Sequence, residues 1–171
     1  MYFAMGEFDI EDISEQRVNN FVASVLWRIV SSNESSQERL KKIVEAISEF
    51  FEIGKCSLMI RENDEFLVIA SVGLSRGVQE STRVKSGEGM AGMAIEEKKS
   101  IFMKKVGMYE KKDNRTYTSD NFIICPIVIN KEVIGILSLT DKFDNRGFNE
   151  RDLYLIQPII DRIIFVLEGV R

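Results

Sequence analysis

The sequence contains no histidine. Without an imidazole, the chain cannot form a histidine-ligated zinc site, a histidine-ligated haem, or a Ser-His or Cys-His nucleophile pair. Most hydrolase mechanisms depend on one of these arrangements. We therefore expect a protein that is not an enzyme, with no catalytic residues and no metal ligands.

Cysteine is scarce, with Cys56 and Cys125 the two in the chain. They lie far apart, inside the apolar runs "KCSLMI" and "FIICPIVI", and do not have the spacing of metal ligands. Because buried cysteine commonly serves as a small hydrophobic residue, we interpret both as structural thiols and not as redox centres.

The sequence also lacks a basic surplus and long apolar runs. Its 23 Lys and Arg against 27 Asp and Glu give a net charge of −4, and the two signs are interleaved, which argues against nucleic-acid binding. The N-terminus turns acidic without the basic start of a signal peptide, and no apolar run could span a bilayer. We expect a soluble, cytoplasmic protein of one domain plus an appendage, with no nucleic-acid or membrane partner.

Three segments have helical periodicity. Residues 10–31 carry an apolar stripe with Trp27 on the opposite face, and Ser35-x-x-Glu38 opens a second helix for which Gly54 is the expected C-cap. Asn149 caps a last helix that has two apolar rows. They are Leu153, Ile156, Ile160, Ile163 and Leu167 in one, and Leu155, Ile159 and Val166 in the other.

Between these helices the pattern is that of strands. "KCSLMIREN" and "EFLVIASVG" predict one hairpin, and "NFIICPIVI" and "EVIGILSLT", joined by Asn130-Lys131, predict another. Shorter strands, "STRVKS" and "SIFMKKV", flank the helical stretch "MAGMAIEEKK". The order predicts an α+β sandwich: a mainly antiparallel sheet of about six strands, with the terminal helices on one face and a short helix plus a lid loop on the other.

The stretch "SGEGMAGMAIEEKK" contains Gly87-x-Gly89-x-x-Gly92, which has the spacing of a dinucleotide-binding loop. Such a loop follows an apolar strand in a parallel βαβ unit, whereas the preceding residues 81–86 are polar and a long loop and a hairpin follow. We interpret the glycines as conformational instead. Gly87 and Gly89 are expected to take positive φ, and Gly92 to permit close approach of the helix to the sheet.

From Lys55 to Leu167 the chain resembles a GAF domain, a small-molecule sensing module. The residues that carry the resemblance are "KCSLMI", "SGEGMAGMAI", "NFIICPIVINKEVIGILSLTDK" and "FNERDLYLI", in this order and spacing. The resemblance implies a GAF domain at 34–171, preceded by a helical appendage at 1–33. In such domains the glycine stretch shapes a wall of the ligand pocket.

The resemblance also implies which residues bind the ligand, whose identity, like that of any cofactor, is unknown. The matching positions are Ser57, Met90, Ala91, Phe102, Tyr117 and Phe122. For Met90, Phe102 and Phe122 a plain core role is the alternative. The polar stretch from Met108 to Asp120 is expected to be a mobile lid over the pocket.

We therefore expect a non-catalytic regulatory domain that binds a small organic ligand and transmits the change through its terminal helices. One alternative is a dimerisation scaffold with a filled pocket. Another is a cyclic-nucleotide-binding domain, similar to GAF domains with an Asn-Lys, Phe, Asp-Glu motif. This chain has Asp141-Lys142, Phe148 and Asp152-Leu153 in those places, and the same residues could simply close the loop before the last helix.

The surplus of apolar residues on the first and last helices predicts a parallel homodimer held by these two helices. In the alternative, a monomer folds its first helix back over its last and buries both stripes within one chain.

Overall fold

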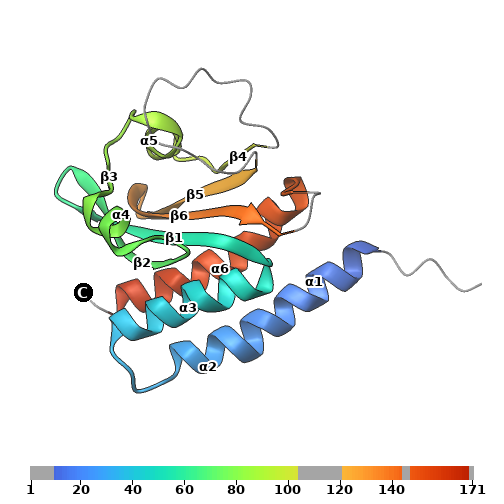
Figure 1. The fold of residues 1–171 in the computed structure, drawn as a ribbon. Helices are drawn as coiled ribbons and strands as arrows, with labels where there is room; N and C mark the ends of the chain where they lie inside the picture. Colours follow the sequence, from blue (N-terminus) through green and yellow to red (C-terminus); the bar gives the residue numbers. More distant parts are fainter. Residues whose placement is uncertain (1–9, 104–120, 144–146, 170–171) are drawn as a thin grey trace, which may run out of the picture.

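The computed structural model describes residues 10–103, 121–143 and 147–169, with side chains described from residue 15 on. Four layers make up the fold: α5, the sheet below it, α3 and α6 below the sheet, and the N-terminal helix beneath those two (Figure 1). The elements in chain order are α1 (Ile10–Asn20), the π-helical segment η1 (Phe21–Leu26), α2 (Trp27–Val30), α3 (Ser36–Phe50), β1 (Ile53–Glu62), β2 (Glu65–Val72), α4 (Arg76–Ser81), β3 (Arg83–Val84), α5 (Gly89–Glu97), β4 (Ile101–Met103), β5 (Phe122–Ile129), β6 (Glu132–Lys142) and α6 (Glu150–Glu168).

The sheet has six strands in the order β3-β2-β1-β6-β5-β4, and every neighbouring pair is antiparallel. The two hairpins of the sequence are therefore correct, and β1 and β6 meet at the centre of the sheet. In the second hairpin, Asn130 and Lys131 have φ values of 50° and 68°, the left-handed pair that a tight two-residue turn needs. The predicted α+β architecture is confirmed.

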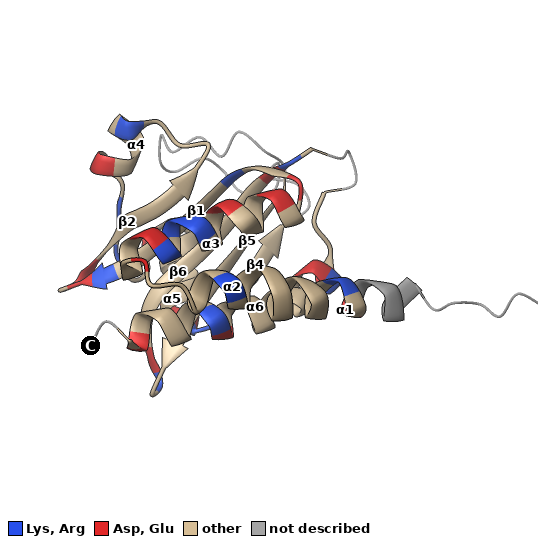
Figure 2. Cartoon of the chain, turned by 90° about the horizontal axis from the view of Figure 1, so that it is seen from below, with Lys and Arg blue, Asp and Glu red and all other residues tan. Residues whose placement is uncertain are grey.

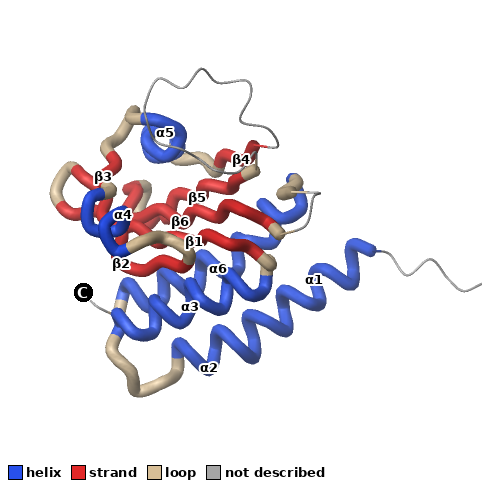
Figure 3. Tube along the Cα trace, viewed as in Figure 1, coloured by secondary structure: helices blue, strands red, loops and turns tan. Residues whose placement is uncertain are grey.

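Both faces of the sheet are covered, as Figure 3 shows. Two buried clusters divide the apolar residues. The helix-side cluster joins the sheet to α3, α6 and the N-terminal helix, and includes Leu58, Ile123 and Leu137. The α5-side cluster includes Met59, Ala94, Phe122 and Ile136. This two-sided burial explains why β5 reads as a nearly continuous apolar run.

The N-terminal helix packs against α3 and α6 of its own chain. Its stripe, exemplified by Val18, Leu26 and Val30, is buried in the helix-side cluster. The second apolar row of α6, with Ile159 and Val166, is buried in the same cluster as the first. The apolar stripes that predicted a dimer are thus packed within one chain, in the manner of the monomer alternative, while Trp27 stays exposed.

A π-helical segment interrupts this N-terminal helix. The buried residues Val18, Val22, Leu26 and Val30 are spaced by four. At about 100° per residue, an unbroken α-helix would rotate this row by roughly 120° from Val18 to Val30. The wider turn of η1 removes much of that rotation, so the whole row faces α3 and α6.

Helix caps largely follow the sequence. The Ser35 hydroxyl accepts a hydrogen bond from the Glu38 N–H at 3.2 Å at the start of α3. The expectation that Gly54 ends this helix is wrong, because Gly54 lies within β1 and Glu52 takes the left-handed conformation, with φ of 53°. The short helix α4, capped by Ser75, was not predicted. Within the described part of the chain, no helix is both long and apolar enough to cross a membrane.

Candidate functional site

Four of the predicted site residues gather between the sheet and α5. Phe122 on β5 and Ala91 on α5 are buried in the α5-side cluster, and Met90 in the first turn of α5 packs against it. Ser57 is half-buried on β1. Its neighbours Cys56 and Leu58 point to the helix side, so alternation along the strand turns Ser57 toward α5.

Of the other two predicted residues, the structure describes Phe102 alone, and Phe102 lies elsewhere. Phe102 packs against the helix-side cluster, since it pairs with Ile123 on β5, which faces the same way. It therefore lies on the opposite face of the sheet from Ser57, and we remove it from the candidate site. Tyr117, together with the proposed lid from Met108 to Asp120, lies outside the described residues.

Sequence reasoning missed two serines that the sheet aligns with Ser57. The register places Ser71 of β2 opposite Ser57 on one side and Ser138 of β6 opposite it on the other. Ser71 and Ser138 are each flanked along their strands by helix-side residues, so all three point toward α5. We call Ser71, Ser57 and Ser138 the serine row. Only the strand register reveals it, because the three are distant in sequence.

Ser71 has an exceptional environment within the serine row. Its hydroxyl oxygen is buried and finds no hydrogen-bond partner among the described residues. A buried hydroxyl without a partner costs about 1–3 kcal/mol. The serine row thus contains at least one hydroxyl that could form a hydrogen bond with a bound molecule.

The surroundings of the serine row change from apolar to polar along the strands. Toward one end, Met59 and Ile136 are buried in the α5-side cluster. Toward the other, Lys55 and Thr140 form the next pair of residues on β1 and β6. The Lys55 ammonium lies 3.0 Å from the carboxylate of Asp141, so its charge is compensated.

The glycine stretch positions α5 above this face. Gly87 and Gly89 have φ values of 80° and 61°, as expected. A Cβ at Gly92 would lie 2.5 Å from the Lys85 carbonyl oxygen. The close approach is therefore to the loop before the helix and not, as expected, to the sheet. The Gly87 N–H donates to the Gly92 carbonyl at 2.9 Å, so the loop and the helix are held together.

Both cysteines are buried in the helix-side cluster, away from the serine row. Burial raises the pKa of the Cys56 thiol far above its ordinary value. Burial also raises the pKa of Cys125 to about 11, although a hydrogen bond with Ser100 lowers it. Because the thiolate is the nucleophile, neither residue is activated for chemistry near neutral pH.

We expect both thiols to resist alkylation in the folded protein. At pH 8, iodoacetamide should modify Cys56 and Cys125 only as fast as the chain unfolds, and the reaction in urea should be faster by orders of magnitude. Mass spectrometry of timed samples measures this. Rapid labelling of either cysteine without denaturant would contradict the assignment.

The residues that match the cyclic-nucleotide motif form a structural network. The Lys142 ammonium donates to the Asp152 carboxylate at 3.3 Å and lies 5.4 Å from the centre of the Phe148 ring. Phe148 is fully buried in the helix-side cluster. These contacts tie the end of β6 to the start of α6, on the opposite side of the sheet from the serine row.

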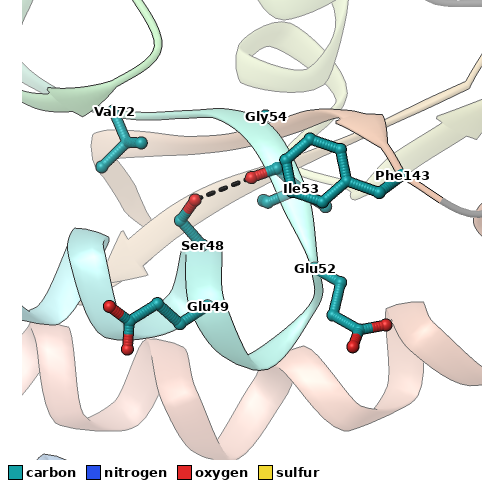
Figure 4. A pocket seen from close by; sticks show the side chains of 7 residues that line it. All are labelled: Ser48, Glu49, Glu52, Ile53, Gly54, Val72 and Phe143. Atoms are coloured by element: carbon teal, nitrogen blue, oxygen red, sulfur yellow. Dashed lines mark hydrogen bonds between the residues drawn. The ribbon is translucent and has the colours of Figure 1, made fainter.

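A hollow of about 650 Å³ lies at the end of α3 and is lined by Ser48, Glu49, Glu52, Ile53, Gly54, Val72 and Phe143 (Figure 4). The buried Ser48 hydroxyl donates to the Ile53 carbonyl at 2.8 Å, so its polar group is satisfied. Among the described residues that line this hollow, there is no predicted site residue. The described residues also contain no cluster of three or more Cys, Asp or Glu side chains that could hold a metal ion.

A family model for the GAF domain matches residues 33–168. The chain belongs to the GAF domain family. The match begins after the N-terminal helix and includes every strand, α5 and α6.

Solved structures have the same fold. The GAF domain of a phosphoenolpyruvate-protein phosphotransferase from Coxiella burnetii has a TM-score of 0.75 and 20% identity, covering 91% of this chain and 94% of that one. The nlh2 GAF domain of A. aeolicus in an inactive state has a TM-score of 0.72 and 17% identity, covering 94% of this chain and 99% of that one. The free methionine-R-sulfoxide reductase of Neisseria meningitidis, in complex with its substrate, has a TM-score of 0.72 and 16% identity, covering 91% of this chain and 93% of that one. No curated protein sequence matches the chain.

Proposed function

We propose that this GAF domain is a cytoplasmic, non-catalytic sensor that binds a small organic ligand between the sheet and α5. The observation that carries the proposal is the serine row, with the buried hydroxyl of Ser71, which has no hydrogen-bond partner in the described part of the chain. A polar row facing α5 from the three strands β2, β1 and β6 is a costly feature for a purely structural core. A ligand that hydrogen-bonds to it offsets that cost.

The state of the cysteines supports a sensor over an enzyme. A reductase of the same fold exists in Neisseria meningitidis, so the fold alone does not decide the matter. In this chain both thiols are buried among apolar side chains, and burial raises the pKa of each. A thiol that stays protonated is a poor nucleophile, which argues against cysteine-based reduction.

Native mass spectrometry of the purified protein tests ligand binding. We expect a small molecule retained by the folded chain and released on denaturation. Ser57→Ala should reduce its occupancy, whereas Ser36→Ala, at the half-buried start of α3, should not. A folded protein that retains nothing, and that no compound in a metabolite library protects against thermal unfolding, would contradict the proposal.

A second candidate is a scaffold with a filled pocket. It is favoured by the dense packing of Ala91, Ala94 and Ile95 of α5 among the buried residues Phe122 and Ile136 of the sheet. The same mass spectrum discriminates the two, because a scaffold of this kind would retain no small molecule.

We further propose a homodimer formed through the outer surface of α2 and α6. Trp27 is 51% exposed and Phe165 is 55% exposed, large values for such apolar side chains. The Arg162 guanidinium of α6 lies 6.0 Å from the Trp27 ring, and Phe165 follows it by one helical turn, so the two aromatic residues share one surface. By contrast, acidic and basic residues are interleaved along α3 (Figure 2).

Sedimentation at micromolar concentration tests the assembly. We expect a dimer that Trp27→Glu or Phe165→Glu dissociates, because each change would place a charge in an apolar interface. Val78→Glu is the matched control, since Val78 is also an exposed apolar residue but lies on α4. A wild-type monomer at this concentration would contradict the proposal.

A further inference from the structure

We infer that the serine row binds an uncharged amide group of the ligand and not a carboxylate, a phosphate or an amine. This inference rests on the proposed function, because it names the chemical class that the same site would take. It is drawn from the hydrogen-bonding capacity, the charge and the length of the serine row and of the strand residues beside it.

The first observation is the hydrogen-bonding capacity. Each serine hydroxyl can donate one hydrogen bond and accept two, so the row offers both donors and acceptors. The Ser71 hydroxyl is buried and has no partner among the described residues, while Ser57 stands next to it on β1 and Ser138 one strand further on, on β6. A primary amide has one acceptor oxygen and two N–H donors, which match such a row.

The second observation is the charge. Along β1, Lys55 is the charged residue closest to the serine row, and Asp141 compensates it at a distance of 3.0 Å. On the other side of the row the residues are Met59 and Ile136, which are buried and apolar. A carboxylate or an ammonium group on the row would therefore lose its water without gaining an opposite free charge from these strands.

The third observation is the length of the row. Neighbouring strands lie about 4.8 Å apart, so the three hydroxyls on β2, β1 and β6 extend over roughly 10 Å. A single polar group, whether a phosphate or an amide, would contact only part of such a row, so the length favours a polar group that is attached to a larger body. An amide attached to an apolar ring or chain would place its polar end on the hydroxyls and its body against Met59 and Ile136.

Three probes that share one ring test the class: benzamide, benzoate and benzylamine. Nitrogen-15 chemical shifts of the backbone amides of Ser57, Ser71 and Ser138 would be measured during titration of the whole chain. We expect benzamide to shift these signals at millimolar concentration and the two charged probes to leave them unchanged. A stronger response to benzoate or benzylamine, or no response to benzamide, overturns the inference.

Ser71→Ala gives a second readout that a merely structural serine would not give. Because the change removes a buried hydroxyl that no described residue bonds, the urea midpoint of the free protein should rise, while the Kd for benzamide should increase about 2- to 10-fold. Ser81→Ala, on the exposed surface of α4, should leave the Kd unchanged. An unchanged Kd in Ser71→Ala overturns the inference whatever the urea midpoint does.

Failure of this inference is distinguishable from failure of the proposed function. If a retained molecule is found by native mass spectrometry and carries a charged group at the serine row, the sensor function stands and the amide class is overturned. If nothing is retained and no probe shifts the row, both are overturned.

Discussion

Replacing Gly92 with alanine is expected to lower the free energy of unfolding by about 1–3 kcal/mol. The new methyl group would lie 2.5 Å from the Lys85 carbonyl oxygen and 2.9 Å from the Gly87 carbonyl carbon, both backbone atoms that cannot rotate away. Relieving this overlap costs about 1–3 kcal/mol, and loss of the Gly87-to-Gly92 hydrogen bond adds about 1 kcal/mol. The better helix propensity of alanine returns about 1 kcal/mol. Urea denaturation measures the difference.

Two other glycines serve as matched controls for space and for conformation. A Cβ at Gly77 in α4 would meet nothing within 4 Å, so Gly77→Ala should be neutral or slightly stabilising. Gly89 also has free space but a φ of 61°, so Gly89→Ala should lose about 1–2 kcal/mol through backbone strain alone. Gly92→Ala with wild-type stability would show that the loop and α5 are not closely packed in solution.

Asp152→Ala should destabilise the protein by about 2–4 kcal/mol, because this carboxylate has two structural partners. It accepts a hydrogen bond from the Asn149 N–H at 3.0 Å in the cap of α6, and another from Lys142 at 3.3 Å. Loss of a helix cap costs about 1 kcal/mol. Both side chains of the ion pair are only 14% exposed, so the change also leaves a half-buried ammonium without its counter-charge.

The double mutant Lys142→Met/Asp152→Asn separates these contributions. If the pair acts as a unit, the double mutant should lose less stability than the sum of the two single mutants. Glu80→Gln is the control, since its partner Arg76 is 91% exposed and such surface pairs contribute little. A loss in Asp152→Ala no larger than in Glu80→Gln would contradict the network. One thermal denaturation series measures the wild type, Asp152→Ala, the two single mutants of the cycle, the double mutant and Glu80→Gln.

The architecture was predictable because its strongest elements carry local signals. Asn130-Lys131 between two apolar runs indicated the second hairpin, and Asn149 indicated the start of α6. The end of α3 was misplaced because glycine usually takes the left-handed conformation that follows a helix. In this chain Glu52 takes it instead. The helix α4 was missed because six residues, none of them buried, carry no periodic signal.

The candidate site was less predictable, since its residues depend on strand register. Phe102 lies in a strand of three residues, too short for alternation to indicate which face it occupies. Ser71 and Ser138 become neighbours of Ser57 only through pairing across β2, β1 and β6. Likewise, an apolar stripe on the first helix and a second one on α6 look the same in sequence whether a partner or the chain itself covers them.

The π-helical segment from Phe21 to Leu26 has a consequence for alignment with relatives. A π-helical turn holds one residue more than an α-helical turn, as if a single residue had been inserted into a regular helix. A relative whose first helix is regular would therefore need a one-residue gap within this segment. Without that gap, Val18 would be aligned with a position that faces solvent. The buried positions that precede the π-helical segment would then be compared with exposed positions of the relative.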